Sequence, residues 1–488
     1  MRWIVLSVYF ACLTVLSLYG AHRWYLLWLY RKHRRGGARP VGHFDRLPRL
    51  TVQLPLYNEM YVAERLIDAV CDLDYPRDRL QIQVLDDSTD ETTSIVARKT
   101  AEVAARGIDI VHLHRTDRSG FKAGALEAGL KVASGELIAI FDADFVPQPD
   151  FARDLVDHFT DPGVGMVQAR WGHLNIDYSP LTSVQSLMLD GHFMIEHTAR
   201  NRSGKFFNFN GTAGIWRRRC IEDAGGWQHD TLTEDLDLSY RAQLAGWRFV
   251  FLPEVVAPAE LPLEMGAFKS QQHRWAKGSI QTARKLLPRI YASDLAWPVK
   301  LEATAHLTAN IGYVLMVVLA LLVVPAVWLR VDVAPWMVAL VDLPIFTLSS
   351  LSVAAFYFVA RSEAAGSRRS ILRWIPALMA VGIGLSINNA RAVIEALTGR
   401  QSSFRRTPKY NLKRNETLSR RKYRITINRD TWIELALAVW FAVATGATMS
   451  AGMWGAVPFL LLFEFGYAYT SISTIVQAFQ PRLEREGA

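Results

Sequence analysis

Long apolar stretches near both ends of the chain predict helices that cross a membrane. A helix needs about 20 apolar residues to span the hydrocarbon core of a bilayer. Stretches of this kind occupy Trp3–Leu29, His306–Leu329, Trp336–Ala360, Trp432–Met449 and Met453–Ala478. We therefore expect five membrane crossings.

A sixth apolar stretch, Ile371–Leu397, is ambiguous because it contains a proline, two asparagines and Arg391. If it crossed, Thr398–Arg429 would lie outside with eleven Lys and Arg residues against the single acid Glu416. That arrangement opposes the positive-inside rule, which also places the basic run Arg31–Arg35 in the cytoplasm. We therefore expect this stretch to lie along the membrane interface or to dip in and return.

The polar middle of the chain, from Phe44 to Leu261, alternates short β-rich runs with helical patterns. The runs that predict strands are Leu50–Leu54, Gln81–Leu85, Asp109–Leu113, Leu137–Phe141 and Val164–Ala169. Helical patterns lie between them at Val62–Cys71, Thr92–Arg106 and Lys122–Ala133. This alternation predicts an α/β domain with a mostly parallel sheet, in which ligands bind beyond the carboxyl ends of the strands.

Polar clusters follow three of the predicted strands, at the sheet edge where ligands bind. They are Pro55, Tyr57, Asn58 and Glu59 after the first strand, Asp86 and Asp87 after the second, and Asp142 and Asp144 after the fourth. One such cluster alone is typical of a turn, since Asp and Asn are frequent turn residues. Asp142 and Asp144 together offer the oxygen ligands that a hard divalent cation needs beside a diphosphate.

Two later motifs carry candidate chemistry, and each also has a structural explanation. Thr233-Glu234-Asp235 opens a helical pattern. Its carboxylates are suited either to accept a proton from an attacking hydroxyl or to stabilise the positive end of a helix. Gln271-Gln-His-Arg274-Trp275 precedes the second predicted span. It is suited either to a diphosphate and a sugar face or to anchoring a helix at the membrane interface.

Composition and charge narrow the possible partners. The 488 residues are 50% apolar and 21% charged, which excludes a disordered chain. The net charge of +9 would suit nucleic acid, but the basic residues concentrate in Arg31–Arg39 and Arg400–Arg429, each beside an apolar stretch. This placement favours the lipid bilayer as partner, and we expect no nucleic acid partner. The three cysteines have no metal-ligand spacing.

Seven motifs occur in one order along the chain. They are Pro55-x-Tyr57-Asn58-Glu59, Asp86-Asp87, Lys122-Ala-Gly124, Asp142-x-Asp144, Phe209-Asn210-Gly211-Thr212, Thr233-Glu234-Asp235 and Gln271-x-x-Arg274-Trp275. Together they resemble the family 2 glycosyltransferases of the cellulose synthase superfamily, and most of all the cellulose synthase-like mannan and glucan synthases. The resemblance covers about residues 50–279. It implies a cytoplasmic GT-A domain, Rossmann-like with a mostly parallel sheet, fused to an α-helical transmembrane channel domain.

The resemblance also implies a role for each motif. The residues expected at the donor nucleotide are Pro55, Tyr57, Glu59, Asp86, Asp87, Lys122, Asp142, Gln271 and Arg274. Asp144, with Asp142, would hold Mg²⁺ or Mn²⁺, and Asp235 would be the general base. The residues expected at the acceptor are Asn210, Gly211, Thr212, Glu234 and Trp275. Direct attack by an acceptor hydroxyl would invert the anomeric carbon of the donor.

Phe404-Arg-Arg406-Thr407-Pro-Lys409 is similar to the gating loop of cellulose synthases, Phe-x-Val-Thr-x-Lys. Arg406 departs from the valine of that pattern. The resemblance implies that Phe404, Thr407 and Lys409 cover the donor from the cytoplasmic side, and a solvated basic loop is the alternative. The sequence shows neither the further N-terminal spans nor the C-terminal PilZ-type domain of bacterial cellulose synthases, so nothing in it predicts control by cyclic-di-GMP.

We expect six consecutive segments. They are an N-terminal transmembrane helix with its basic exit (1–43), the GT-A domain (44–261), interfacial helices (262–305), two transmembrane helices (306–360), a cytoplasmic interfacial helix with the gating-type loop (361–430), and two transmembrane helices with the tail (431–488). This organisation implies a multi-pass protein of the inner or plasma membrane with its catalytic domain in the cytoplasm.

The expected function is processive, inverting synthesis of a β-linked polysaccharide, a β-glucan or a β-mannan or glucomannan, which the enzyme translocates across the membrane. The expected donor is UDP-glucose, with GDP-mannose as the alternative, and the acceptor is the growing glycan. Two other functions remain open. One is the transfer of a single sugar to a membrane lipid, and the other is a non-catalytic channel for glycan export.

Overall fold

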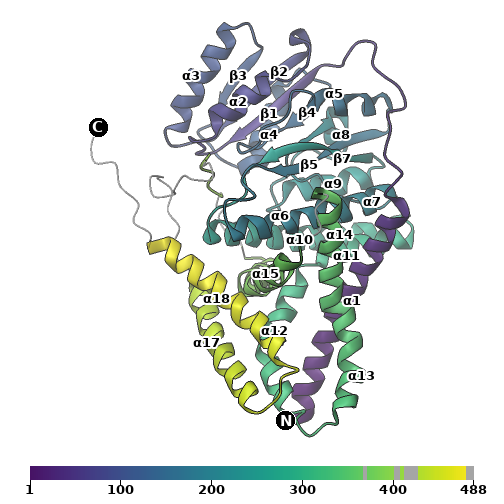
Figure 1. The fold of residues 1–488 in the computed structure, drawn as a ribbon. Coiled ribbons are helices and arrows are strands. Elements are labelled where there is room, and N and C mark those ends of the chain that lie inside the picture. Colours follow the sequence, from purple (N-terminus) through teal and green to yellow (C-terminus); the bar gives the residue numbers. More distant parts are fainter. Residues whose placement is uncertain (366–370, 401–406, 412–426, 480–488) are drawn as a thin grey trace.

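The computed structural model describes residues 1–365, 371–400, 407–411 and 427–479. A sheet with helices on both faces forms one end of the molecule, and long helices extend away from it (Figure 1). Between these two parts lie helices that run roughly along the base of the sheet domain (Figure 1).

The sheet has seven strands in the order β3-β2-β1-β4-β6-β5-β7. Their bounds are β1 Leu50–Leu56, β2 Leu80–Asp86, β3 Ile110–His114, β4 Leu137–Ile140, β5 Val164–His173, β6 Gly214–Arg217 and β7 Arg248–Ala259. The strands predicted from the sequence are confirmed, but β6 and β7 were not predicted. Because β6 pairs antiparallel with both β4 and β5, the sheet is mixed.

Helices cover both faces of the sheet. Those of the sheet domain are α2 Ala63–Cys71, α3 Thr92–Ala105, α4 Phe121–Val132, α5 Phe151–Val156, α8 Arg218–Asp223 and α9 Glu234–Leu244, with short 3₁₀ turns at Arg77–Arg79 and Asp157–Thr160. Side chains alternate between the faces, so that Leu137 and Ala139 of β4 join one apolar core and Ile138 and Ile140 join the other. Both cores hold the strand ends in place.

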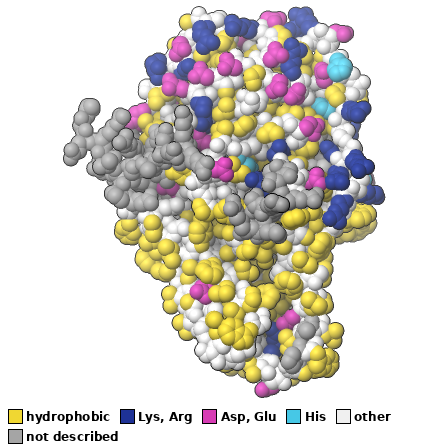
Figure 2. Space-filling model, in the orientation of Figure 1, with side chains coloured by type: hydrophobic (Ala, Val, Ile, Leu, Met, Phe, Trp, Pro, Cys, Tyr) yellow, Lys and Arg dark blue, Asp and Glu magenta, His cyan; other side chains and the backbone are white. Residues whose placement is uncertain are grey.

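Within the described residues, five helical segments are long and apolar enough to cross a membrane. They are α1 Arg2–His33, α12 Ile311–Trp328, the continuous run α13 Pro335–Phe346, η4 Thr347–Leu351 and α14 Ser352–Ala365, α17 Arg429–Ser450 and α18 Val457–Phe479. Large apolar side chains are exposed along them, such as Leu340 (69%) and Val443 (64%). Hydrophobic side chains dominate the surface of this half (Figure 2). The chain is a membrane protein.

Some predicted stretches differ in detail from the helices observed. The span predicted from His306 begins at Ile311 instead, because His306 belongs to α11 Trp297–Thr308. The ambiguous sixth stretch is two helices, α15 Ile371–Gly384 and α16 Ser386–Leu397. They meet at a bend of 44°. Such a bend is compatible with a broken span or a re-entrant segment, so the interfacial placement stays a prediction.

The helices between the two parts carry buried ion pairs. They are α6 Pro180–Asp190, the π-helical turn η3 Gly191–His197, α7 Thr198–Arg202, α10 Met265–Ala292 and α11. Lys269 of α10 pairs with Glu434 of α17, and Asp190 of α6 pairs with Arg361 of α14 at 2.7 Å. Such pairs fix these intermediate helices against the apolar helices, because breaking one leaves a buried charge uncompensated.

A close helix crossing between α15 and α18 gives a stability prediction. A Cβ added to Gly466 would lie 2.3 Å from the carbonyl oxygen of Ala380, which is backbone and cannot rotate away. We expect Gly466→Val to separate the helices and to cost about 1–3 kcal/mol or more. Thermal unfolding in detergent measures the change. The matched control is Gly446→Val in α17, where an added Cβ meets nothing within 4 Å. Equal melting temperatures for the two variants would contradict the prediction.

Candidate active site

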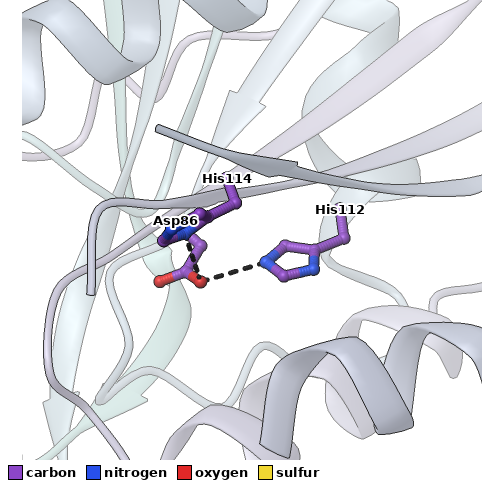
Figure 3. Close-up of side chains that lie close together, drawn as sticks. All are labelled: Asp86, His112 and His114. Atoms are coloured by element: carbon purple, nitrogen blue, oxygen red, sulfur yellow. Dashed lines mark hydrogen bonds and ion pairs between the residues drawn. The ribbon is translucent and has the colours of Figure 1, made fainter. Parts of the chain in front are cut away.

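The end of β2 carries the two acids expected at the nucleoside. Oδ2 of Asp86 lies 3.0 Å from Nε2 of His112 and 3.1 Å from Nδ1 of His114 (Figure 3). Both histidines lie on β3, the neighbouring strand. Burial alone would raise the pKa of Asp86, but hydrogen bonds from His112 and the backbone of Ser88 outweigh it and lower this pKa to about 2. Asp86 is therefore a fixed anion at neutral pH.

The residues around Asp86 are held by charge and backbone geometry. Arg115 donates to both carboxylate oxygens of Asp87, at 2.7 and 2.6 Å. The guanidinium of Arg118 lies 3.3 Å from the ring centroid of Tyr57. Asn58 adopts a left-handed conformation with φ of 57°. It ties the end of β1 to the loop after β2, since its backbone N–H donates to Ser88 Oγ at 2.8 Å. Pro55 is the half-buried next-to-last residue of β1, and the carbonyl of Glu59 accepts from the first turn leading into α2.

Within the described residues, the cluster with three ligand atoms close enough to share a metal is Asp86, His112 and His114. Imidazole nitrogen suits softer metals than Mg²⁺, which prefers oxygen ligands. Each histidine also has an ordinary explanation as a hydrogen-bond donor to Asp86. The expected Mg²⁺ or Mn²⁺ position therefore stays at Asp142 and Asp144.

Asp142, directly after β4, lies between Lys122 and the acceptor motif. Lys122 Nζ forms an ion pair with Asp142 and donates to the carbonyl of Gly211 at 2.9 Å. The backbone N–H of Asp142 donates to Thr212 Oγ1 at 2.9 Å. Burial acts to lower the pKa of Lys122, but Asp142 and Glu234 outweigh it and raise this pKa. A permanent cation thus faces the place expected for the diphosphate.

Asp144 is paired with a lysine from the gating-type motif. Lys409 Nζ contacts the carboxylate of Asp144 and the carbonyl oxygen of Glu260. Tyr410 donates from its hydroxyl to Glu264 at 2.6 Å, which holds the segment 407–411 against the sheet domain. Thr407 is buried, whereas Phe404 lies outside the described residues.

The two carboxylates fit a divalent cation. Asp142 and Asp144 stand two residues apart with oxygen donors only, and each already carries a positive partner, Lys122 or Lys409. A site that attracts two ammonium groups is electrostatically suited to a hard cation completed by diphosphate oxygens.

Asp235 lies in the first turn of α9. This position is suited to a general base, but it also suits the alternative in which the carboxylate stabilises the positive end of the helix. Its Oδ1 accepts from the backbone of Leu236 at 2.8 Å, and Thr233 occupies the N-cap without a side-chain cap. Burial is the main cause that raises the pKa of Asp235 to about 7, with Glu234 adding to it and Lys122 opposing it. A Cβ added to Gly211 would lie 3.0 Å from Asp235 Oδ2, so the acceptor motif directly faces this carboxylate.

A large cavity begins at Asp235. It has a volume of about 1420 Å³ and extends from Asp235, Asn210, Gln271 and Trp275 to Tyr9 and Asp342 among the apolar helices. Arg274 is on the same helix, α10, in a field of four carboxylates, those of Glu234, Asp142, Asp235 and Asp144. The structure therefore brings Lys122, Asp142, Asp235 and the Gln271–Trp275 motif together, while Asp86 and Asp87 lie at and just after the end of β2.

Several residues at this site were missed by the sequence analysis. His112 and His114 alternate along a strand next to Asp86, a spacing that places them on one face. His192, Glu196 and Arg200 recur every four residues on one helical face and line the cavity. Both spacings are visible in the sequence, but neither shows which partner they face.

The sequence of this chain is similar to known glycosyltransferases. Residues 48–278 match the family described as "Glycosyltransferase like family 2". The chain is 40% identical over 279 residues to "Probable glucomannan 4-beta-mannosyltransferase 7" of Oryza sativa subsp. japonica, covering 56% of this chain and 48% of that protein. It is 43% identical over 255 residues to "Probable glucomannan 4-beta-mannosyltransferase 10" of Arabidopsis thaliana, covering 51% and 46%. The chain spans about half the length of these relatives.

The fold is also found among solved structures. The mannosyltransferase PcManGT from Pyrobaculum calidifontis, solved in complex with GDP-Man and Mn²⁺, matches with a TM-score of 0.54 at 22% identity. The match covers 82% of this chain and 99% of that one. The predicted fold class, a GT-A domain joined to apolar helices, is confirmed.

Proposed function

We propose that this chain, whose residues 48–278 form a glycosyltransferase family 2 domain resembling those of cellulose synthase-like mannan synthases, polymerises a β-linked mannan or glucomannan from a nucleotide sugar. The observation that carries the proposal is one continuous arrangement. The carboxylate of Asp235 lines a cavity that leads between the apolar helices, and the cationic Lys122 lies close enough to Asp235 to act on it electrostatically.

Asp235 accepts the proton of the attacking acceptor hydroxyl. The oxygen of that hydroxyl forms a bond to the anomeric carbon of the donor, while the bond to the nucleoside diphosphate breaks. Attack from the side opposite the leaving group inverts the anomeric centre and yields a β-linkage from an α-linked donor. Asp86 and Asp87 hold the nucleoside, and Lys122 and Arg274 offset the charge of the departing diphosphate.

Asn210 and Trp275 position the acceptor beside Asp235. Both line the cavity wall next to it, and an indole face suits the apolar face of a sugar ring. Asp142 and Asp144 would hold a divalent cation, Mn²⁺ or Mg²⁺, which neutralises diphosphate charge when bound.

GDP-mannose replaces UDP-glucose as the expected donor. The two plant relatives reported above are described as probable glucomannan 4-β-mannosyltransferases, and they are 40% and 43% identical to this chain over the matched residues. The same descriptions favour 1,4-linkage. Transfer of mannose rather than glucose is therefore the better expectation for this chain.

The apolar helices would pass the product across the inner or plasma membrane. In this arrangement the sheet domain faces the cytoplasm, because the basic residues after α1 lie beside it. The lining of the cavity, which includes Trp275 as well as Arg330 and Asp342 among the apolar helices, supports this proposed translocation.

The test uses the full chain in lipid nanodiscs with radiolabelled GDP-mannose, UDP-glucose and UDP-N-acetylglucosamine, each with Mn²⁺ or Mg²⁺. The expected product is a long polymer from GDP-mannose that a β-1,4-mannanase degrades. A single sugar on a lipid would replace polymerisation by single-sugar transfer. No transfer from any donor, with glycan transport retained, would support the export channel.

The raised pKa of Asp235 predicts a pH dependence. A general base acts in its deprotonated form, so kcat/KM should rise with pH and level off above about pH 7. Initial rates at limiting donor between about pH 5 and 9 measure the inflection. A flat profile across this range would exclude Asp235 from proton transfer in the rate-limiting step.

Lys409 and a divalent cation compete for Asp144. We expect Lys409→Gln to tighten Mn²⁺ binding severalfold, since removing the ammonium leaves the carboxylate free for the metal. Calorimetric titration of Mn²⁺ without donor measures this, with Lys131→Gln on the exposed end of α4 as control. Unchanged or weaker Mn²⁺ binding in Lys409→Gln would contradict the competition.

A further inference from the structure

The wall of the cavity beside the acceptor motif is unusually polar for a space among apolar helices. His192, Glu196 and Arg200 line it, together with Asn210 and His306. Farther along, the lining becomes apolar, with residues such as Met316, Leu319 and Val323. Its volume of about 1420 Å³ exceeds the roughly 300–1,000 Å³ of a pocket for one drug-sized ligand. The cavity as a whole therefore has room for more than the sugar that reacts.

The polar wall is tied directly to the acceptor motif. The amide nitrogen of Asn210 lies 2.7 Å from His192 Nε2, and its amide oxygen lies 2.7 Å from His197 Nε2. This pairing makes His192 Nε2 an acceptor and leaves Nδ1 to donate to Glu196 Oε2 at 3.1 Å. Since Gly211, next to Asn210, faces Asp235, His192 is joined by one hydrogen bond to the motif that faces Asp235.

Glu196 differs from the neighbouring Arg200 because one of its carboxylate oxygens takes no part in its two ion pairs. Arg200 is 2% exposed and pairs with Glu302 at 2.9 Å, a wholly internal contact. Glu196 is 28% exposed, and both of its ion pairs, to His192 and Arg200, use Oε2. Within the described residues, neither ion pair uses its other oxygen, Oε1, and Glu196 itself lines the cavity.

A carboxylate and an imidazole on a cavity wall are suited to sugar hydroxyls. Hydrogen bonds to a charged acceptor are stronger than neutral ones, which gives such a pair discriminating power. The pair sits on the π-helical turn Gly191–His197, a wide turn often found at functional sites. Keeping a charged carboxylate in this position costs desolvation that apolar packing would avoid.

We infer that His192 and Glu196 form a subsite for the second sugar of the acceptor glycan, a β-linked hexose. The inference rests on the proposed function, because it takes Asp235 and Asn210 to mark the terminal sugar. It assigns the acceptor-length preference of the enzyme to these two side chains. Arg200 and Glu302 hold Glu196 in position from behind.

The test compares mannose with β-1,4-mannobiose as acceptor for the full chain in nanodiscs. In the wild-type enzyme kcat/KM should be higher for the disaccharide. We expect Glu196→Gln to lower the disaccharide-to-monosaccharide ratio of kcat/KM about tenfold, the effect of losing one hydrogen bond to a charged group. KM for the donor should stay within about twofold. The control, Glu222→Gln, breaks an exposed pair with Arg218 of the same four-residue spacing and should leave the ratio unchanged.

The possible outcomes distinguish failure of the subsite from failure of the proposed function. If Glu196→Gln lowers kcat/KM by the same factor for both acceptors, its role is structural and the subsite is overturned, while the proposed function stands. If the wild-type enzyme transfers no sugar to either acceptor or to a longer glycan, the proposed function falls and the subsite with it. His192→Gln provides the second variant if Glu196→Gln melts at a lower temperature. A ratio unaffected by His192→Gln also overturns the subsite.

Discussion

Asp235→Asn should lower kcat by about 100- to 10,000-fold while donor affinity stays close to that of the wild-type enzyme. Asparagine has nearly the same shape, and its oxygen can still accept the hydrogen bond from the backbone of Leu236. It cannot accept the proton of the acceptor hydroxyl. The loss should therefore appear in turnover and not in binding, which single-turnover transfer and calorimetric titration of the donor separate.

Two further variants sharpen this result. Asp223→Asn, at the exposed end of α8, removes a carboxylate away from the cavity and should retain full turnover. Glu234→Gln, next to Asp235, should reduce turnover much less, because the family resemblance places Glu234 at the acceptor and the proposed mechanism gives it no proton to accept. Turnover by Asp235→Asn within tenfold of wild type would assign proton transfer to another group.

Asp144→Asn should abolish metal-dependent donor binding, with a loss of about 100-fold or more in donor affinity in the presence of Mn²⁺. A neutral amide supplies a much weaker ligand to a hard cation than a carboxylate does. Titration of Mn²⁺ followed by titration of GDP-mannose measures the two steps separately. Donor affinity that still depends on Mn²⁺ as in the wild-type enzyme would remove Asp144 from the metal site.

The partner of Asp144 must be controlled in this experiment. Asp144→Asn leaves the buried Lys409 without its carboxylate, which can destabilise the fold. The double variant Asp144→Asn with Lys409→Gln removes that unpaired charge and should still fail to bind Mn²⁺. Asp150→Asn, an exposed acid at the start of α5, is the matched control and should bind Mn²⁺ normally. The single changes at Asp144 and Lys409 should thus move Mn²⁺ affinity in opposite directions.

Much of the fold can be predicted from the sequence. The alternation of β-rich and helical runs predicts β1 to β5 because parallel strands buried on both faces need continuous apolar runs such as Leu137–Ile140. The membrane-spanning helices can also be predicted, since a run of about 20 predominantly apolar residues is typical of a helix that crosses a bilayer. The strand β6 is only four residues long and has no comparable apolar run in the sequence. It forms through antiparallel pairing with its neighbours β4 and β5.

The candidate site shows the same division. The sequence places Asp142, Asp144 and Asp235 at element ends, where side chains converge by topology. It cannot show that Lys409, 265 positions after Asp144, pairs with it, or that His112 and His114 face Asp86. Such contacts depend on packing across the sheet and between domains, which local pattern does not encode.

The sequence by itself determined the class of protein, the family resemblance, the apolar helices and the chemical groups available for catalysis. Only the tertiary structure decided which groups face one another. It buried Asp235 beside Glu234 so that its pKa rises to about 7. It also set His192 and Glu196 on the wall of a cavity that begins at Asp235. The physical reason is that burial, charge pairing and enclosed volume arise from residues far apart in the chain.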